Sequence, residues 1–503
     1  MMKSNEDVDT ISLARFLEAL YGSGLRATDP RLVEFSARLG NLTEDMVDRI
    51  TFKNLVEPNI AIISRAFRRK FIIPDFTAFA SRLDDIYNQC VNVTDGNVAS
   101  YIPELAKADP NCWGYAMCTI DGQRHSLGNC TIPFTMQSCS KPLTYAIALE
   151  HLGADGVHQY VGQEPSGRIF NALALDIDNK PHNPMVNAGA ILICSLLQNL
   201  VHFEMSFEQK LAYIMQHVQK AAGGEFLGYN DDVFLSEKCT GFRNYALAYL
   251  MKEQKCFPEM ADVEEVLSLY FSTCCIESHC ESMSVMAATL ANGGICPITD
   301  EKVFSSATVR DVLSLMHSCG MYDYSGQFAF KVGLPAKSGV SGSLMLVIPN
   351  VMGLALWSPP IDRHGNSCRC LKFCELLLQE YNFHPYEHMG HATIKKRDPR
   401  MYSHHLQEST VLHLLFYAAA GDIGALRRHY LAGFDMSLGD YDGRTALHLA
   451  AAEGHLDCVK FLVEHCRVPC DPSDRWGHSP LDEAKGFQHP EVEQYLSTHL
   501  KNG

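Results

Sequence analysis

Two short motifs near the C-terminal end of this 503-residue chain recur at a spacing that constrains how it folds. Thr445-Ala-Leu-His-Leu-Ala450 and Ser479-Pro-Leu-Asp-Glu-Ala484 begin 34 positions apart. Each opens on a residue that commonly caps a helix and continues into an apolar turn, so each predicts the start of a helix pair. A single helix pair cannot bury its own apolar face. The spacing therefore predicts a stack in which each pair packs on the next.

Both motifs match the T-P-L-H-x-A signature of ankyrin repeats. Gly421 and Gly454 lie 33 positions apart and predict a degenerate earlier unit over Ala418–Gly433. About three units are needed for a stable array. We therefore predict ankyrin repeats over residues 408–503. We expect so short an array to be stabilised by contact with another domain or subunit.

The rest of the chain divides into three regions. Residues 1–97 indicate short amphipathic helices, residues 98–387 mix helix and strand signals, and residues 388–407 are predicted to be a polar linker. Met345–Ile348 is predicted to be a strand and Ser140–Leu152 a helix, which favours an α+β enzyme domain over a helical bundle. At roughly 150 residues per domain, a chain of this length fits about three domains.

The N-terminal region contains helix-loop-helix patterns that are EF-hand-like. Asp29-Pro30 predicts an N-cap followed by proline at the first helical position, and Thr43 is predicted to cap a second helix that contains Met46 and Ile50. No Asp-x-Asp/Asn-x-Asp/Asn-Gly loop with its distal glutamate is present. We therefore expect no calcium site here.

Charge and hydropathy exclude two classes of function. Lys and Arg number 42 against 58 Asp and Glu, for a net charge of −16, which disfavours a surface built to bind nucleic acid. The most apolar stretch, residues 188–203, is interrupted by Gln198 and Asn199 and is too short to span a bilayer. We expect no membrane insertion.

Nineteen cysteines, an odd number without disulfide-like spacing, predict reduced thiols inside the cell. The polar N-terminus resembles neither a signal peptide nor a transit segment, so a cytoplasmic location stays open. The two densest cysteine groups lack paired zinc-ligand spacing, and we predict no metal site. These groups are Cys274, Cys275, His279 and Cys280, and Cys368, Cys370 and Cys374.

The sharpest chemical signal is Ser138-Cys-Ser-Lys141 at the start of a predicted helix. Residues three apart share a helical face, so the serine hydroxyl and the lysine amine can meet. A serine needs a base to become nucleophilic, and a buried lysine can stay neutral and serve as one. Chance alone gives S-x-x-K roughly twice in such a chain, so the motif by itself favours coincidence.

A second motif favours a functional serine over coincidence. Lys337-Ser338-Gly339 precedes a glycine-edged strand that runs to Ile348. Serine acyl-transfer enzymes of the penicillin-recognising type pair S-x-x-K on a helix with K-T/S-G on a neighbouring strand, whose N–H groups help form an oxyanion hole. Tyr322, between the two motifs, offers a proton shuttle. The three elements in this order favour a serine hydrolase.

Four longer segments resemble the phosphate-activated glutaminases of the animal kidney and liver type: Gln137–Ile147, Tyr160–Gly167, Pro181–Gly189 and His317–Asp323. The resemblance covers nearly the whole chain. It implies a serine β-lactamase-like α+β domain between the N-terminal helices and the ankyrin repeats. It also implies hydrolysis of L-glutamine to L-glutamate and ammonia.

The resemblance implies a role for individual residues. Ser138 would form a glutamyl-enzyme ester, Lys141 would be its base, and Tyr322 would relay a proton to the departing ammonia. The N–H groups of Ser138 and Val340 would form the oxyanion hole. On the residue pattern alone, Asn183 and Asn187 fit a turn-capping role as well as they fit a substrate-binding role. The positions matching the family's glutamine-binding residues are Tyr101, Gln137, Asn187, Glu237, Asn244 and Tyr270.

The family's gating loop corresponds to Gly167–Leu175, and its predicted members are Arg168, Phe170, Asn171 and Leu173. The vertebrate pattern has a lysine where this chain has Ala172 and a phenylalanine where it has Ala174. This departure leaves open whether inorganic phosphate activates the protein and whether inhibitors bind at the dimer–dimer contact. The resemblance implies no cofactor.

The resemblance further implies a mitochondrial location and an allosterically regulated homotetramer, a dimer of dimers that extends into filaments. The sequence identifies no partner for the ankyrin repeats. Two alternatives remain: a penicillin-recognising hydrolase that uses the same serine and lysine, and an ankyrin scaffold with an inactive enzyme-like domain. Turnover of glutamine or of nitrocefin separates these alternatives.

Overall fold

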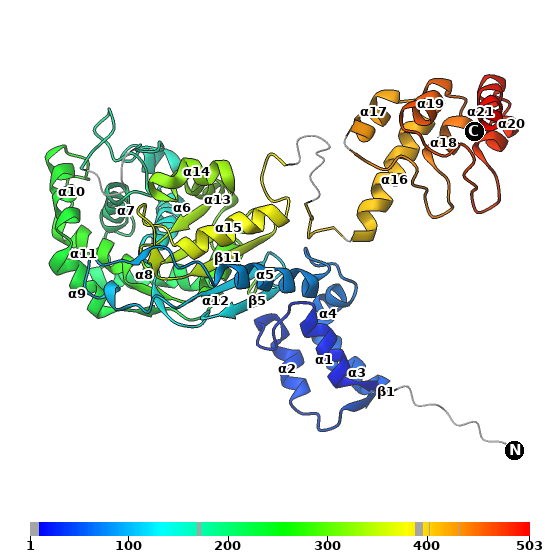
Figure 1. Cartoon of the computed structure of the whole chain (residues 1–503). Coiled ribbons are helices and arrows are strands. Elements are labelled where there is room, and N and C mark those ends of the chain that lie inside the picture. Colours follow the sequence, from blue (N-terminus) through cyan, green and yellow to red (C-terminus); the bar gives the residue numbers. More distant parts are fainter. Residues whose placement is uncertain (1–9, 168–172, 388–395, 402, 432, 503) are drawn as a thin grey trace, which may run out of the picture. The chain divides into compact units, whose positions relative to one another are not determined.

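Figure 1 shows the computed structural model of the chain, which divides into two compact units, residues 1–383 and 384–503. The residues that the structure describes are 10–167, 173–387, 396–401, 403–431 and 433–502.

The N-terminal part of the first unit is a set of short helices around a two-stranded ribbon in which β1 and β2 pair antiparallel. Phe16 is partly buried and packs against the core of this part, with its ring 4.9 Å from that of Phe52 and 5.0 Å from that of Phe67. The elements are β1 (Thr10–Ser12), α1 (Leu13–Gly22), η1 (Pro30–Leu32), α2 (Val33–Leu39), β2 (Met46–Asp48), α3 (Arg49–Val56), η2 (Glu57–Asn59), α4 (Ile60–Phe67) and α5 (Phe76–Cys90).

One of the two predicted caps in this region is confirmed and the other is wrong. The Asp29 carboxylate accepts a hydrogen bond from the backbone N–H of Arg31, with Pro30 as the first residue of η1. Thr43 caps no helix, because Met46–Asp48 is extended and pairs with β1. Asp48 caps α3 instead and accepts bonds from two backbone N–H groups of its first turn.

The larger part of the first unit is built on a five-stranded antiparallel sheet of order β5-β4-β11-β10-β9. Smaller sheets of order β6-β8-β7 and β12-β3 lie outside it. The strands are β3 (Asn97–Val98), β4 (Gly114–Thr119), β5 (Arg124–Gly128), β6 (Phe134–Thr135), β7 (Gly228–Tyr229), β8 (Ile276–Ser278), β9 (Ala336–Ser338), β10 (Ser343–Ile348), β11 (Met352–Trp357) and β12 (Pro360–Ile361).

Both faces of this sheet are covered, which explains why the predicted strand at 345–348 has no polar alternation. Leu344, Leu346 and Ile348 point to one core, shared with α5 and α15, and Met345 and Val347 point to the other, shared with α12. Figure 1 shows α5 and α15 crossing the sheet. The sheet is therefore the middle layer of a helix–sheet–helix arrangement.

The helices of this part gather into a largely apolar body beside the sheet, in which α7 packs on α6 and α11. They are η3 (Leu105–Lys107), η4 (Gln137–Ser140), α6 (Lys141–His158), α7 (Asn187–Asn199), α8 (Phe207–Ala221), α9 (Asp231–Thr240), α10 (Phe242–Glu253), α11 (Val263–Cys274), α12 (Cys280–Ala291), α13 (Ser306–Cys319), η5 (Tyr322–Tyr324), α14 (Ser325–Lys331) and α15 (Cys368–Glu380).

The apolar stretch at 188–203 proves to be mostly the core helix α7, buried from Asn187 to Leu197. Among the described residues, no helix combines the length and the hydropathy needed to cross a membrane. All 19 cysteines are free.

The second unit stacks helix pairs as the repeat spacing predicts. Thr445 and Ser479 are the N-cap residues of α18 and α20, and the His448 ring reaches across to the carbonyl of His478 in the next repeat at 3.1 Å. The elements are α16 (Ser403–Ala419), α17 (Ile423–Leu431), α18 (Ala446–Ala452), α19 (Leu456–Lys460), η6 (Phe461–His465), α20 (Pro480–Gly486) and α21 (Pro490–Asn502). Helix α16 begins inside the range 388–407 that the sequence predicts as a linker.

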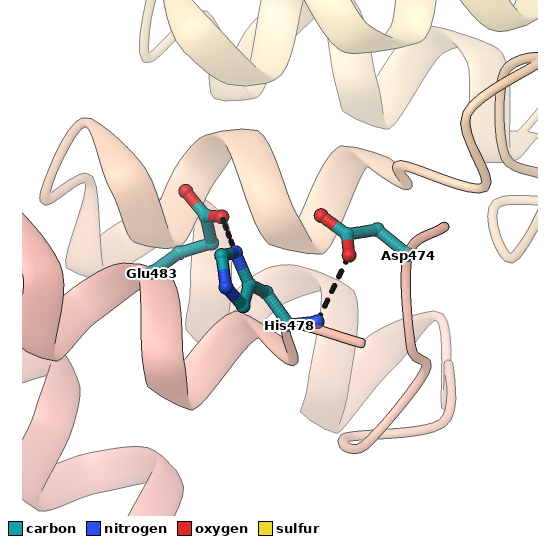
Figure 2. A group of neighbouring side chains, drawn as sticks. All are labelled: Asp474, His478 and Glu483. Carbon is teal, nitrogen blue, oxygen red and sulfur yellow. Dashed lines mark hydrogen bonds and ion pairs between the residues drawn. The ribbon is translucent and has the colours of Figure 1, made fainter. Parts of the chain in front are cut away.

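Asp474, His478 and Glu483 come together in the last repeat, with ligand-type atoms within 4.8 Å of one another (Figure 2). Both carboxylates already make interactions that stabilise the fold. Asp474 accepts bonds from the backbone N–H groups of Trp476 and His478, and Glu483 forms an ion pair with Arg444 at 2.7 Å. The Arg444 guanidinium already supplies the positive charge that a metal would bring, so this group is a turn cap beside an ion pair.

Within the first unit, the partly buried carboxylate of Glu281 links the N-terminal helices to the sheet. Both Glu281 oxygens accept bonds from the Arg26 guanidinium, each at 2.8 Å, and Ser126 on β5 donates to the same group. Burial alone would raise the pKa of Glu281, but the bonds and charge of Arg26 outweigh it and lower this pKa to about 2. Because the pKa is depressed by folding, the charged form of Glu281 stabilises the protein.

We expect Glu281→Gln to lower the free energy of unfolding by roughly 2 kcal/mol at pH 7. The stabilisation is present above the unfolded-state pKa of about 4.5 and is lost as the pH falls toward about 2. The difference between the wild type and the variant should therefore shrink progressively from about pH 5 down to about pH 2. Urea denaturation at a series of pH values measures it.

The matched control is Glu301→Gln, which removes an exposed pair with Lys220. Such a pair contributes less than about 1 kcal/mol. Equal losses in the two variants would contradict a special role for Glu281.

Candidate active site

Ser138 lies in the 3-10 turn η4 immediately before α6, not in the α-helix that the sequence predicts. A 3-10 turn has three residues per turn, so positions i and i+3 still share one face. The preceding residue, Gln137, has a φ of +48°, a conformation that costs energy for a residue with a side chain. This strained residue precedes Ser138, which is 7% exposed and lines a pocket.

Lys141 is the first residue of α6 and is 2% exposed. Its Nζ donates to Oδ1 of Asn187 at 2.7 Å and to the carbonyl of Met185 at 3.4 Å. Burial lowers the pKa of Lys141 to about 8. The neutral amine, which a base for the neighbouring serine requires, is therefore a minor form at pH 7 and becomes the main form as the pH rises past about 8.

Tyr322 opens the turn η5 and has a φ of +55°. This turn is fixed by Ser325, whose hydroxyl donates to the carbonyl of Tyr322 and accepts from the N–H of Met321. Burial raises the pKa of Tyr322 above its usual value, and a hydrogen bond with Ser138 opposes that shift. The structure thus brings the tyrosine and the serine of the two separate motifs together.

Val340 lies in the tight connection between β9 and β10. The N–H of Gly339 donates to the carbonyl of Ser343 and the N–H of Gly342 to that of Gly339. Gly342 has a φ of +89°, and a Cβ there would lie 2.1 Å from a carbonyl oxygen, so only glycine fits. This turn places Val340 in the lining of the pocket that contains Ser138.

Glu237 lies on α9 and is 3% exposed. It accepts a hydrogen bond from the Tyr101 hydroxyl at 2.6 Å, and the oxygen of the same hydroxyl lies 3.0 Å from the side-chain amide of Gln137. Burial raises the pKa of Glu237, while its bonds to Tyr101 and Gln137 act in the opposite direction. A buried carboxylate in a pocket is suited to hold an ammonium group.

The two asparagines that the sequence left open have different tasks. Asn183 holds a turn, since its Oδ1 accepts from the backbone N–H groups of Met185 and Val186. Asn187, at the start of α7, instead joins Lys141 to Asn244 on α10, donating to the Asn244 side chain at 3.0 Å. Asn183 is thus a turn-capping residue, and Asn187 is not.

Nine of the ten predicted catalytic and binding residues fall on or beside one cavity of about 260 Å³, and Tyr322 meets them through Ser138. Its volume lies below the 300–1,000 Å³ typical of sites for drug-sized ligands, so it suits a molecule the size of an amino acid. Tyr270, on α11, is 4% exposed, and burial raises its pKa. The lining residues are Tyr101, Gln137, Ser138, Asn187, Glu237, Thr240, Gly241, Arg243, Asn244, Tyr270 and Val340.

Sequence reasoning did not assign Thr240 or Gly241 to this pocket, and it gave the Lys337 side chain no role. Lys337 is fully buried beside Tyr322. Of the predicted gating loop, Arg168, Phe170 and Asn171 lie outside the described residues, and Leu173 is 52% exposed.

The family model described as glutaminase matches residues 96–386, more than half of the chain. The chain belongs to the glutaminase family. Further models match an EF-hand domain at residues 1–74 and ankyrin repeats at residues 414–502.

Curated relatives agree over most of the length. The mitochondrial liver isoform of glutaminase from Rattus norvegicus is 50% identical over 499 residues, which cover 98% of this chain and 82% of that protein. A glutaminase of Nostoc sp. is 43% identical over 308 residues, 61% of this chain and 90% of its own. The crystal structure of Mglu in its glutamate form matches with a TM-score of 0.57 and 34% identity, covering 62% of this chain and 70% of that one.

These findings confirm the resemblance that the sequence motifs indicated. The enzyme is a glutaminase that hydrolyses glutamine to glutamate, with an α+β catalytic domain, EF-hand-like helices before it and ankyrin repeats after it.

Proposed function

We propose that this glutaminase hydrolyses L-glutamine through a glutamyl ester on Ser138. The observation that supports it most is the buried Lys141 amine, with its pKa lowered to about 8, three residues from a serine that lines an amino-acid-sized cavity. Lys141 accepts the serine proton as Ser138 attacks the side-chain amide carbon. The tetrahedral oxyanion is held by the N–H groups of Ser138 and Val340.

Tyr322 donates its proton to the amide nitrogen, which leaves as ammonia, and water then hydrolyses the ester. The substrate's α-ammonium lies against Glu237. Its α-carboxylate takes hydrogen bonds from the neighbouring polar groups, which are Tyr101, Gln137, Asn187, Asn244 and Tyr270. Neither this binding nor the chemistry requires a cofactor.

Replacing the nucleophile tests this mechanism. We expect Ser138→Ala to lower kcat for glutamine by at least about 10⁴-fold, because no other group in the pocket replaces the serine oxygen. The melting temperature should stay close to that of the wild type. Ammonia release is the measurement, and the control is Ser140→Ala, which removes a neighbouring hydroxyl that donates to the Gln137 carbonyl. Full activity of Ser138→Ala would overturn the mechanism.

We also propose that the enzyme works as a regulated homo-oligomer in mitochondria, with inorganic phosphate as its activator. Exposed apolar side chains on α9 and α10 support self-association: Leu235, Phe242 and Tyr249 are 56%, 74% and 51% exposed. The location is supported by the name of the rat relative.

Light scattering with a parallel activity assay tests the assembly. We expect a tetramer that grows toward longer assemblies as phosphate is added, with kcat rising over the same phosphate range. Phe242→Ser should lower the molar mass without unfolding the chain, because it removes exposed apolar surface only. An active, phosphate-insensitive monomer would exclude both the oligomer and the activator.

A further inference from the structure

One tryptophan contacts both chain segments that supply the oxyanion hole. Trp357 is the last residue of β11 and is 5% exposed. Its Nε1 donates to the carbonyl of Ser341 at 3.0 Å, one residue after Val340. Its ring stacks on that of Phe134, four residues before Ser138, with the centroids 5.1 Å apart and the planes inclined by 18°. A single side chain on the sheet therefore links the two segments whose N–H groups must converge on one oxygen atom.

The segment that carries Val340 is a four-residue β-turn. The N–H of Gly342 donates to the carbonyl of Gly339 at 3.0 Å, so Val340 and Ser341 are the two central residues. This closing bond uses the N–H of the last residue of the turn, and it leaves the N–H of Val340 to point outward. The orientation of the whole turn then decides where that N–H points.

Hydrogen bonds from the end of β11 and the residue after it hold this turn. The N–H of Ser358 donates to the carbonyl of Gly342 at 3.0 Å, and the Trp357 indole donates to that of Ser341. A cavity of about 360 Å³ lies beside the turn and is lined in part by Val340, Ser341 and Trp357. The turn therefore has space to shift once the indole bond is lost.

A purely structural role for a buried indole is visible at Trp113. It is 3% exposed, its Nε1 donates to the carbonyl of Tyr87 at 3.3 Å, and its ring stacks on the Tyr87 ring at 5.2 Å. Tyr87 lies on α5, and Trp113 packs into the core on the face of the sheet opposite Trp357. A buried indole N–H needs an acceptor, and Trp113 finds one in the scaffold. Trp357 finds its acceptor beside the reaction centre instead.

We propose that Trp357 is a positioning residue that sets the separation of the two oxyanion-hole N–H groups, those of Ser138 and Val340. This inference rests on the proposed ester mechanism. Both N–H groups must lie within hydrogen-bond distance of the oxygen that becomes negative. The indole N–H holds the Val340 turn, and the stack on Phe134 aligns it with the segment that precedes Ser138. Trp357 is not among the described residues that line the substrate cavity, so it acts through the turn.

The two N–H groups act at the same point in both half-reactions. As the Ser138 oxygen bonds to the amide carbon, the electron pair of the C=O π bond moves onto the oxygen, and the serine proton goes to Lys141. The pair returns to re-form the carbonyl when ammonia leaves, and the same cycle repeats when water attacks the ester. Because the substrate binds before this charge develops, a displaced turn weakens the transition state and not the Michaelis complex.

The test is Trp357→Phe in the full-length enzyme, which keeps an aromatic ring against Phe134 and removes the N–H. We expect kcat to fall by about 10- to 100-fold, less than the loss of a whole oxyanion donor, while KM for glutamine changes by less than about three-fold. The acid limb of the pH profile of kcat should stay in place, because Lys141 keeps its surroundings. Steady-state kinetics over a range of pH measures all three.

A boronic acid reports on the oxyanion hole directly. In the analogue of L-glutamine whose side-chain amide is replaced by a boronic acid, the boron accepts the Ser138 oxygen and becomes a tetrahedral anion. We expect its inhibition constant to rise in Trp357→Phe by roughly the factor by which kcat falls. The inhibition constant of L-glutamate, which has a planar carboxylate, should change by less than about three-fold. A general structural defect would weaken both ligands alike and would contradict the inference.

Trp113→Phe is the matched control, since it also removes a buried indole N–H and keeps a ring in its place. We expect it to lower the melting temperature and to leave kcat and the boronate inhibition constant at wild-type values. A wild-type kcat in Trp357→Phe would overturn the inference, as would equal losses of kcat in the two variants.

A second variant decides if Trp357→Phe does not fold. Phe134→Leu keeps the indole N–H and removes the ring on which the indole stacks. We expect its kcat and its boronate affinity to fall by about three-fold or more, the range that an aromatic pair contributes, with KM for glutamine unchanged. Wild-type values of both would contradict the role of Trp357.

Failure of the inference is distinguishable from failure of the proposed function. Activity in Ser138→Ala would remove the ester mechanism itself. An inactive Ser138→Ala together with an unaffected Trp357→Phe would remove only the role of Trp357.

Discussion

The catalytic site depends on amines buried without the solvent that would normally keep them charged. Lys141 and Lys337 are 2% and 0% exposed, and burial lowers the pKa of both. Desolvation of this kind costs free energy that the large apolar core supplies. What the cost yields is a lysine beside Ser138 whose neutral form is far more populated near neutral pH than it would be in water.

This burial requires both halves of the first unit. The helical half contributes Lys141 at the start of α6 and its partner Asn187 at the start of α7, and the sheet contributes Lys337 and the turn that presents Val340. Because the sheet is covered on both faces, its edge strand β9 can carry a buried lysine. The strained backbone of Gln137 and Tyr322 lies where these two halves meet, as expected for residues that surrounding structure holds in costly conformations.

Much of this was readable from the sequence, because long motifs and simple spacings fix local structure. The repeat spacing located the α18 and α20 caps, and the S-x-x-K and K-S-G motifs located the helix start and the hairpin. Pattern alone could not separate Asn183 from Asn187, since both lie in one amide-rich turn and only the fold decides which faces Lys141. The Thr43 prediction failed because pairing of β2 with β1 overrides a local capping signal. The place of Lys337 over Tyr322 depends on a contact between segments that no periodicity encodes.

The central claim is that an ester forms on Ser138, and the most direct measurement is mass spectrometry after rapid acid quench of the enzyme with saturating glutamine. The account predicts one glutamyl group on the peptide that contains Ser138, lost when Ser138 is replaced by alanine. Because Cys139 is its neighbour, fragmentation must place the group on the serine oxygen. A glutamyl group on the Cys139 sulfur, or turnover with no acyl-enzyme at any quench time under conditions that slow hydrolysis of the ester, would contradict it.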